Sequence, residues 1–369
     1  MTAPARAYDV LLLDLDGTVY LGGQVIEHAP PVLAAVAELG VRNMFVTNNA
    51  SRSPAEVAVA LTDMGMPATA ADVLTSPQAA ATMLADSHPA GSPVLIIGAA
   101  ALADAVTAVG LRSVTEAAER PVALVQGHSP DTGWRQLAEG CIALRAGVDW
   151  VACNVDSTLP SDRGLLPGNG SMVAALVTAT GRRPRVAGKP NRPLLDEAVR
   201  RAGAQAPLVV GDRLDTDIEA GITAGLPSLL VLTGVSTAAD LLAAAPECRP
   251  TLLALDLRGL IDADRMVRLD PPPDPASAPD PTDPTDPTDP NDRGKSIAPF
   301  TVRSDGDVLQ LSCGSGQGED PVRPEPDRID LLVLAALARA AWASGTTRVE
   351  PAEDAARAVL RRLGLLSVA

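Results

Sequence analysis

The chain has 369 residues, enough for two or three domains, and its 46% hydrophobic and 20% charged residues are typical of a globular protein. The net charge of -15 and the aromatic content of only 2% argue against a nucleic-acid partner, because a polyanion would be repelled and few rings could stack on bases. The four cysteines form no CxxC pair, which gives no zinc motif and favours a reducing, cytoplasmic location.

Short apolar runs alternate with Ala- and Leu-rich stretches over the first 265 residues. Such alternation predicts βαβ units and an α/β fold with a doubly wound, Rossmann-like parallel sheet. We expect strands at Val10–Leu13, Asn43–Val46, Val94–Ile97, Val122–Val125, Asp149–Ala152, Leu208–Val210 and Leu229–Leu232. We expect helices at Pro30–Glu38, Pro54–Met64, Ala100–Val109, Asp131–Leu144, Ser171–Thr180, Leu194–Arg201 and Thr216–Ala224.

One uncharged stretch of 20 residues, Ala220–Ala239, raises the question of a membrane span. Pro227 and several Gly, Ser and Thr residues interrupt it. A helix end, a turn and a buried strand explain it better, so no membrane span is expected.

Four short motifs follow predicted strands or open predicted helices. The first is Asp14-Leu15-Asp16-Gly17-Thr18, after the first strand. Ligands of open α/β sheets bind beyond the carboxyl ends of the strands, and two acids there repel each other unless they share a cation or a proton. Mg²⁺ suits such oxygen ligands and keeps substrate phosphate in its shell. A simple turn at the strand end is the alternative.

The second motif runs from Thr47 through Asn48 and Asn49 to Ser51, and its hydroxyl, amide and backbone N–H groups could hold a phosphate oxygen. The same residues also suit a turn and a helix N-cap. The third motif, Gly188-Lys189-Pro190, would alone be an ordinary surface lysine.

The fourth motif is Gly211-Asp212, followed by Asp215 and Asp217, at the entry to a helix. Asp215 could be the N-cap of that helix. Asp212 lies at the strand tip and is not needed as a cap, so a metal ligand is the better interpretation. Asp217 could help to orient Asp212 without binding the metal itself. Four such motifs in this order are hard to explain as independent turns.

Their order resembles that of the haloacid dehalogenase-like (HAD) hydrolase superfamily, over roughly residues 8–265. The resemblance implies that Asp14 is the nucleophile and Asp16 the general acid/base of a phosphatase. Thr47 and Lys189 would hold phosphoryl oxygens, together with Gly17, Asn48 and Asn49. Mg²⁺ would be bound by Asp14, the Asp16 backbone carbonyl and Asp212, with Asp217 helping. An acid at position 16 favours phosphate esters, since a halide leaving group needs no proton.

The 141 residues that separate Thr47 from Lys189 leave room for an inserted domain. It resembles the C2-type cap of the NagD-like (4-nitrophenylphosphatase) subgroup, through the run from Asn154 and Asp156 to Pro167-Gly168-Asn169-Gly170-Ser171. Asn154 and Asp156 would then contact substrate, although Cys153 and His128 depart from the subgroup pattern. The resemblance predicts a phosphatase core at 1–75 and 187–268 and a cap at 76–186.

Residues 269–298 are rich in Pro and Asp and predict a linker, followed by a small α+β domain at 299–369. Gly314-Ser315-Gly316-Gln317-Gly318 faintly resembles the pyrophosphate loop of GNAT acetyltransferases, and a flexible turn is the alternative.

Composition, tail and cap most resemble the actinobacterial glycerol-3-phosphate phosphatases. A small phosphomonoester substrate is expected, with glycerol 3-phosphate first and phosphoglycolate, pyridoxal phosphate, nucleotides or sugar phosphates as alternatives. A homodimer through the cap is also expected. The rival interpretation is an acetyltransferase-like or interaction module fused to a non-catalytic phosphate-binding core.

Overall fold

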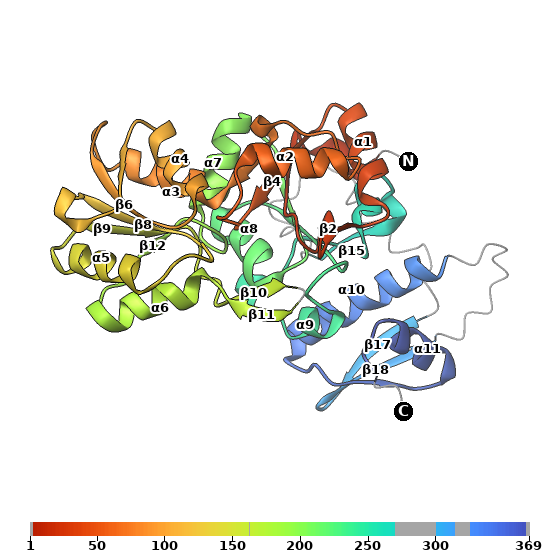
Figure 1. The fold of residues 1–369 in the computed structure, drawn as a ribbon. Helices are drawn as coiled ribbons and strands as arrows, with labels where there is room; N and C mark the ends of the chain where they lie inside the picture. The colour runs from red at the N-terminus through yellow and green to blue at the C-terminus, as the bar shows by residue number, and fades with distance from the viewer. Residues whose placement is uncertain (1–2, 162, 270–299, 314–324, 367–369) are drawn as a thin grey trace, which may run out of the picture.

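The computed structural model describes residues 3–161, 163–269, 300–313 and 325–366. The predicted linker, apart from Leu269, and the glycine-rich segment 314–318 lie outside the described residues. Two parallel sheets and a smaller three-stranded sheet organise the rest (Figure 1). Among the described residues, none of the helices has the length and apolar character that crossing a membrane requires.

The larger sheet has seven strands in the order β16-β15-β14-β13-β1-β4-β5, parallel except for β16. Its strands are β1 (Val10–Leu13), β4 (Arg42–Thr47), β5 (Val73–Thr75), β13 (Pro207–Gly211), β14 (Ser228–Val231), β15 (Leu252–Ala254) and β16 (Met266–Arg268). Its principal helices are α1 (Ala29–Glu38), α2 (Pro54–Asp63), α7 (Pro193–Ala202), α8 (Glu219–Ala224) and α9 (Ala238–Leu242). Short 3₁₀ helices run along one edge, among them η6 (Leu257–Leu260) and η7 (Ala263–Arg265).

Strand β1 shows why these strands are apolar throughout. Side chains of a strand alternate between the two faces of its sheet. Leu12 packs in a cluster with Leu194 of α7, whereas Leu11 and Leu13 belong to a second cluster with Val32 of α1. Helices therefore cover both faces of the sheet, as the continuous apolar runs predict.

The inserted segment forms a second parallel sheet in the order β12-β9-β8-β6-β7. Its strands are β6 (Pro93–Ile97), β7 (Arg112–Val114), β8 (Ala123–Gln126), β9 (Asp149–Ala152) and β12 (Arg185–Val186), with the hairpin β10 (Thr158–Ser161) and β11 (Gly164–Pro167). Its helices are α3 (Ser76–Ala85), α4 (Ala100–Ala108), α5 (Trp134–Arg145) and α6 (Asn169–Thr180). One apolar cluster joins Val46 of the larger sheet to Val125 and Val151 of this one.

The C-terminal unit consists of β17 (Phe300–Asp305), β18 (Val308–Cys313), β19 (Val349–Pro351), α10 (Pro326–Ser344) and α11 (Asp354–Arg362). Helix α10, blue in Figure 1, lies against α9, β15 and β16. Leu334 and Leu337 of α10 share one apolar cluster with Leu230 of β14 and Leu241 of α9. The broad apolar face of this helix is thus buried against the larger sheet.

Two predicted helices differ from the observed ones. The segment predicted as a helix from Asp131 begins only at Trp134, where the Gln136 side chain accepts the Gly133 N–H at 3.0 Å. The stretch predicted as a helix over Thr216–Ala224 starts instead as a π-helical turn, Leu214–Ile218, before α8. Helix α3 was not predicted, because its Ala-rich sequence has no polar face and six of its ten residues are buried.

Leu334→Ala should test the junction between α10 and the larger sheet. Leu334 is fully buried, so the substitution leaves a cavity and should cost about 2–5 kcal/mol of unfolding free energy. The midpoint of urea unfolding measures this loss. Val59→Ala, at a residue 61% exposed, is the control and should change stability by no more than about 0.5 kcal/mol. An unchanged midpoint for Leu334→Ala would show that the junction does not contribute to stability.

Candidate active site

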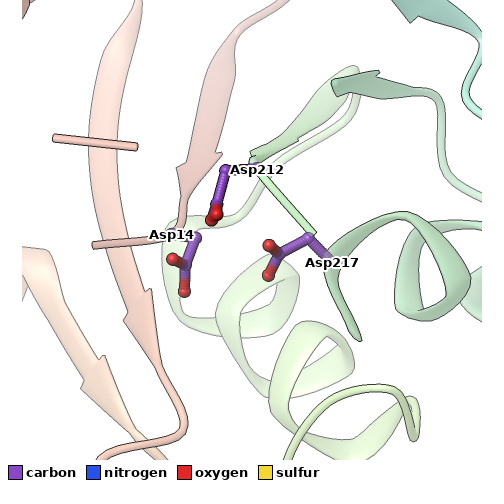
Figure 2. Close-up of side chains that lie close together, drawn as sticks. All are labelled: Asp14, Asp212 and Asp217. Carbon is purple, nitrogen blue, oxygen red and sulfur yellow. The ribbon is translucent and has the colours of Figure 1, made fainter. Parts of the chain in front are cut away.

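Acidic side chains from separate motifs meet at the carboxyl end of the larger sheet. Asp14 follows β1 and Asp212 follows the adjacent strand β13, while Asp217 comes from the π-helical turn. Figure 2 shows the three side chains gathered close together. Each offers an oxygen within 4.8 Å of the others, the one such group of acids among the described residues.

Lys189 lies buried between two of these acids. Its Nζ is 2.5 Å from Asp14 Oδ1 and 2.6 Å from Asp217 Oδ1, and it donates a longer bond of 3.3 Å to the Val46 carbonyl. Only 3% of the lysine side chain is exposed. The third motif therefore contributes a buried ammonium group to the site, where an isolated sequence motif would suggest a surface lysine.

The site carries an excess of negative charge. Burial, together with the charge of Asp217, raises the pKa of Asp14 to about 7 although Lys189 opposes the shift. Burial and Asp217 also raise the pKa of Asp212 to about 6. Burial alone would lower the pKa of Lys189, but the carboxylates of Asp14 and Asp217 outweigh it and raise the value. Three carboxylates against one ammonium leave two negative charges uncompensated when all are ionised.

A divalent cation fits this donor set. Asp212 accepts the Val235 N–H on Oδ2 at 2.6 Å, while its buried Oδ1 has no hydrogen-bond partner. Both oxygens of Asp217 are already used, one by Lys189 and the other by the Arg213 N–H at 3.1 Å. Asp14 and Asp212 are thus the carboxylates best placed to ligate a hard cation such as Mg²⁺. Asp217 supports the site by holding Lys189.

The Asp212 carboxylate packs against two glycines, at positions where any side chain would overlap it. A Cβ at Gly17 would lie 2.3 Å from Asp212 Oδ2, and one at Gly234 would lie 2.1 Å from the same atom. Gly17 also has a φ of +92°, which favours glycine. The Gly17 N–H donates to the Tyr20 carbonyl and closes a turn. It is therefore already used and differs from the prediction that Gly17 binds phosphate. Gly234 was not predicted, because a lone glycine in a Thr-Gly-Val-Ser turn carries no distinctive signal.

Asp16 has a different setting from the buried acids. Its side chain is exposed, and it pairs through the backbone with Tyr20. Burial raises the pKa of Tyr20 to about 12, and the charges of Asp16 and Asp14 add to this shift. Asp16 therefore lies beside the cluster on the solvent side, where it can exchange protons with water.

The residues predicted from the second motif divide into distinct tasks. Thr47 ends β4 and accepts the Asn49 N–H at 3.1 Å. Asn48 accepts the Lys189 N–H at 2.8 Å and donates to the Lys189 carbonyl at 3.0 Å. Asn49 accepts from the N–H and hydroxyl of Ser51, at 2.8 and 2.7 Å. Asn48 thus fixes the backbone of the buried lysine, whereas Asn49 closes a turn.

The two predicted residues of the inserted segment reach the same place. Asn154 donates to the Asn48 carbonyl at 2.8 Å, and its side-chain oxygen accepts the Asp156 N–H at 3.3 Å. Burial raises the pKa of Asp156, and the charge of Arg213 opposes this shift. Arg213, which was not predicted, also pairs with Asp215 at 2.9 and 3.0 Å. Asp215 lies inside the π-helical turn, whose N-cap is Arg213, so the alternative that Asp215 is the N-cap is wrong.

Gly234→Ala should displace the Asp212 carboxylate, because the added methyl group has no space. We expect at least a tenfold loss of divalent-cation affinity, the scale of losing a group that orients a metal ligand. Isothermal titration with MgCl₂ measures it. Gly133→Ala is the matched control, since its Cβ would meet nothing closer than 3.6 Å. Equal affinities for the two variants would contradict the close packing of Gly234 on Asp212.

Comparison with known proteins agrees with this geometry. Residues 11–112 match the family model of haloacid dehalogenase-like hydrolases, 186–260 match a HAD-hydrolase-like model, and 298–365 match a GCN5-related N-acetyltransferase like domain. The D-glycerol 3-phosphate phosphatase of Mycobacterium tuberculosis is 47% identical, over 99% of this chain and 97% of that protein. A 5′-nucleotidase of Bacillus subtilis is 39% identical, over 63% of this chain and 90% of that protein.

Solved structures give the same result. The crystal structure of the glycerol phosphate phosphatase of Mycobacterium tuberculosis in complex with magnesium matches with a TM-score of 0.84 and 44% identity, over 99% of this chain and all of that one. A p-nitrophenyl phosphatase from Archaeoglobus fulgidus matches with a TM-score of 0.65 and 28% identity, over 69% of this chain and 99% of that one. The predicted resemblance and the α/β fold are confirmed, and the chain belongs to the haloacid dehalogenase-like hydrolase family.

Proposed function

We propose that this chain hydrolyses a small phosphomonoester through an aspartyl-phosphate on Asp14, with Mg²⁺ as its cofactor. The observation that carries the proposal is the convergence of Asp14, Asp212 and Asp217 around Lys189, which leaves two negative charges uncompensated when all four groups are ionised. The magnesium-bound structure of a relative supports the choice of cation. When bound, Mg²⁺ would supply positive charge against the phosphoryl oxygens, with Asp14, Asp212 and the Asp16 carbonyl as its protein ligands.

The first step transfers the phosphoryl group to the protein. A carboxylate oxygen of Asp14 attacks phosphorus, and the bond from phosphorus to the ester oxygen breaks. The exposed carboxyl group of Asp16 gives its proton to the departing alcohol oxygen. Lys189 favours the ionised form of Asp14 and orients its carboxylate through the 2.5 Å contact. Its longer bond to the Val46 carbonyl, at 3.3 Å, is the one that a phosphoryl oxygen can replace.

The second step releases phosphate. Asp16, now a carboxylate, takes a proton from water as the water oxygen attacks the phosphorus on Asp14. The bond between phosphorus and the Asp14 oxygen breaks, which yields inorganic phosphate and restores the Asp14 carboxylate. The covalent intermediate divides one difficult displacement into two easier ones. The hydroxyl of Thr47 and nearby backbone N–H groups would hold the phosphoryl oxygens during both steps.

Glycerol 3-phosphate is the substrate we propose first, since a relative with that activity aligns over nearly the whole chain. The charges of Asp156 and Arg213 interact, and the Asp156 N–H donates to the Asn154 side chain, so we propose that this pair contacts the alcohol part of the substrate. Domain boundaries at 75/76 and 186/187, a homodimer through the cap and a cytoplasmic location stay predictions. The acetyltransferase alternative is favoured only by the family match of 298–365, and binding of acetyl-CoA to the full chain would test it.

Asp14→Asn should abolish phosphate release, because an amide oxygen is a poor nucleophile. Chelation of the metal with EDTA should do the same to the wild type. A malachite-green assay measures the released phosphate, and circular dichroism checks that the variant is folded. Undiminished turnover by Asp14→Asn would refute the proposed intermediate.

Lys189→Ala should lower kcat by roughly two or more orders of magnitude, the scale of losing a preorganised charge contact. Arg192→Ala, three residues away at an exposed position paired only with Asp196 among the described residues, is the control and should retain wild-type kcat. Steady-state kinetics with a saturating phosphomonoester measures both. A loss confined to KM would place Lys189 in binding alone.

A panel of phosphomonoesters should rank glycerol 3-phosphate highest in kcat/KM. The panel contains phosphoglycolate, pyridoxal phosphate, a nucleoside monophosphate and a hexose phosphate, each assayed with Mg²⁺. A higher value for any of these would replace the proposed substrate without affecting the proposed chemistry.

A further inference from the structure

The loop that precedes α9 contacts both acidic segments of the site. The Thr233 hydroxyl donates to the Gly17 carbonyl at 2.6 Å, and the Val235 N–H donates to Asp212 Oδ2 at 2.6 Å. Ser236 makes two hydrogen bonds. Its N–H donates to the Asp212 carbonyl at 3.1 Å, and its hydroxyl oxygen accepts the Leu214 N–H at 3.0 Å. The position of residues 233–236 therefore determines where the Asp212 carboxylate points.

Helix α9 continues directly from this loop. Thr237 caps its N-terminus by accepting the Asp240 N–H. The helix is only five residues long, Ala238–Leu242, and so short a helix depends on tertiary contacts for its position. Whatever holds its far end also restrains the loop before it.

The C-terminal unit holds that far end. Trp342, near the end of α10, donates its Nε1–H to the Leu241 carbonyl at 2.9 Å. The Arg249 guanidinium lies 5.0 Å from the centre of the Trp342 ring, and Arg249 Nε donates to the Ala244 carbonyl just beyond α9. A cation over an aromatic ring is stabilising, and Trp342 adds a side-chain donor to the Leu241 carbonyl, which also accepts the Ala244 N–H at 3.2 Å.

Apolar contacts connect the same parts. Leu241 and Leu242 of α9 share a cluster with Leu334 and Ala338 of α10. Leu214 and Ile218, from the π-helical turn that carries Asp217, belong to the same cluster. The π-helical turn after Asp212 and helix α9 thus belong to the same apolar cluster as the C-terminal unit.

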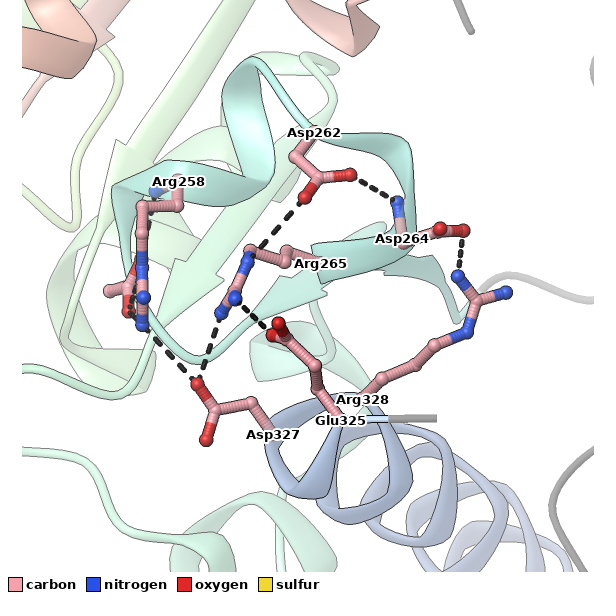
Figure 3. A network of polar contacts seen from close by, with 8 residues as sticks. Arg258, Asp262, Asp264, Arg265, Glu325, Asp327 and Arg328 are labelled. Atoms are coloured by element: carbon pink, nitrogen blue, oxygen red, sulfur yellow. Dashed lines mark hydrogen bonds and ion pairs between the residues drawn. The ribbon is translucent and has the colours of Figure 1, made fainter. Parts of the chain in front are cut away.

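A second docking point lies at the other end of α10. Figure 3 shows Arg258 and Arg265, from the η6 and η7 turns, facing Asp327 and Glu325. Arg265 contacts Asp327 at 3.0 Å and Glu325 at 2.5 Å, while Arg328 pairs with Asp264. Asp327 and Trp342 are separated by roughly 22 Å along the helix, from its rise per residue. The two docking points can therefore be altered independently.

We propose that Trp342 is a positioning residue for the cation site, acting through α9 and the 233–236 loop on Asp212. The inference rests on the proposed cation site. It gives the C-terminal unit a task in the phosphatase, that of fixing the backbone N–H that orients Asp212. The ion pairs around Asp327 only attach the unit.

The test compares Mn²⁺ binding, measured by electron paramagnetic resonance well below the unfolding temperature, in three single variants of the full chain. Trp342→Phe keeps a ring for Arg249 and removes the donor to Leu241. Its dissociation constant for Mn²⁺ should rise about threefold to tenfold, below the loss of 10–100-fold expected for a group that directly orients a ligand. Trp134→Phe, at a tryptophan that is 81% exposed, should bind as the wild type does.

Asp327→Asn removes the acid that faces Arg258 and Arg265. It should lower the unfolding temperature and leave the dissociation constant unchanged. Wild-type affinity in Trp342→Phe, or an equal weakening in Asp327→Asn, would overturn the positioning role. Failure of the wild type itself to bind Mn²⁺ would instead count against the proposed cation site.

Discussion

The site depends on a buried ammonium group shared by two carboxylates. Lys189 satisfies one oxygen of Asp14 and one of Asp217, and almost none of its side chain meets water. Desolvating these charges is costly unless each is paired, so neither acid could be buried here without the lysine. The remaining charge, centred on Asp212, has no protein partner on its inner oxygen. The end of the sheet thus carries uncompensated negative charge. This charge suits the binding of a divalent cation, which can in turn attract a phosphate group.

The rest of the structure serves to hold that arrangement. Strands β1 and β13 place Asp14 and Asp212 side by side because parallel neighbours end at the same edge of the sheet. Asn48 follows β4, the strand on the other side of β1, and its side chain hydrogen-bonds to the backbone N–H and carbonyl of Lys189. The inserted segment then reaches back through Asn154 to the Asn48 carbonyl. The site is assembled from distant parts of the chain, held together by hydrogen bonds between asparagine side chains and backbone groups.

Sequence alone predicted the residues whose chemistry is visible in their side chains. Asp14, Asp212 and Lys189 could be identified because each follows an apolar strand or opens a helix in a known order. Gly234 and Val235 could not, since they act through a missing Cβ and a backbone N–H, and their turn looks like any other. Asn49 was predicted to bind phosphate because amide side chains are common both in turns and in ligand sites. In the structure its side-chain oxygen accepts the Ser51 N–H and closes a turn.

The shared apolar cluster between the two parallel sheets has a consequence for modular exchange. Leu84 of α3 and Leu195 of α7 pack in that cluster with Val46 and Val151, so the boundary between core and insertion has no solvent layer. Replacing the inserted segment with that of a related enzyme would disrupt this cluster. To keep its stability, such a chimera would have to carry α3 and the facing side chains of α7 along with the transplanted sheet, because close-packed interiors tolerate changes of shape poorly.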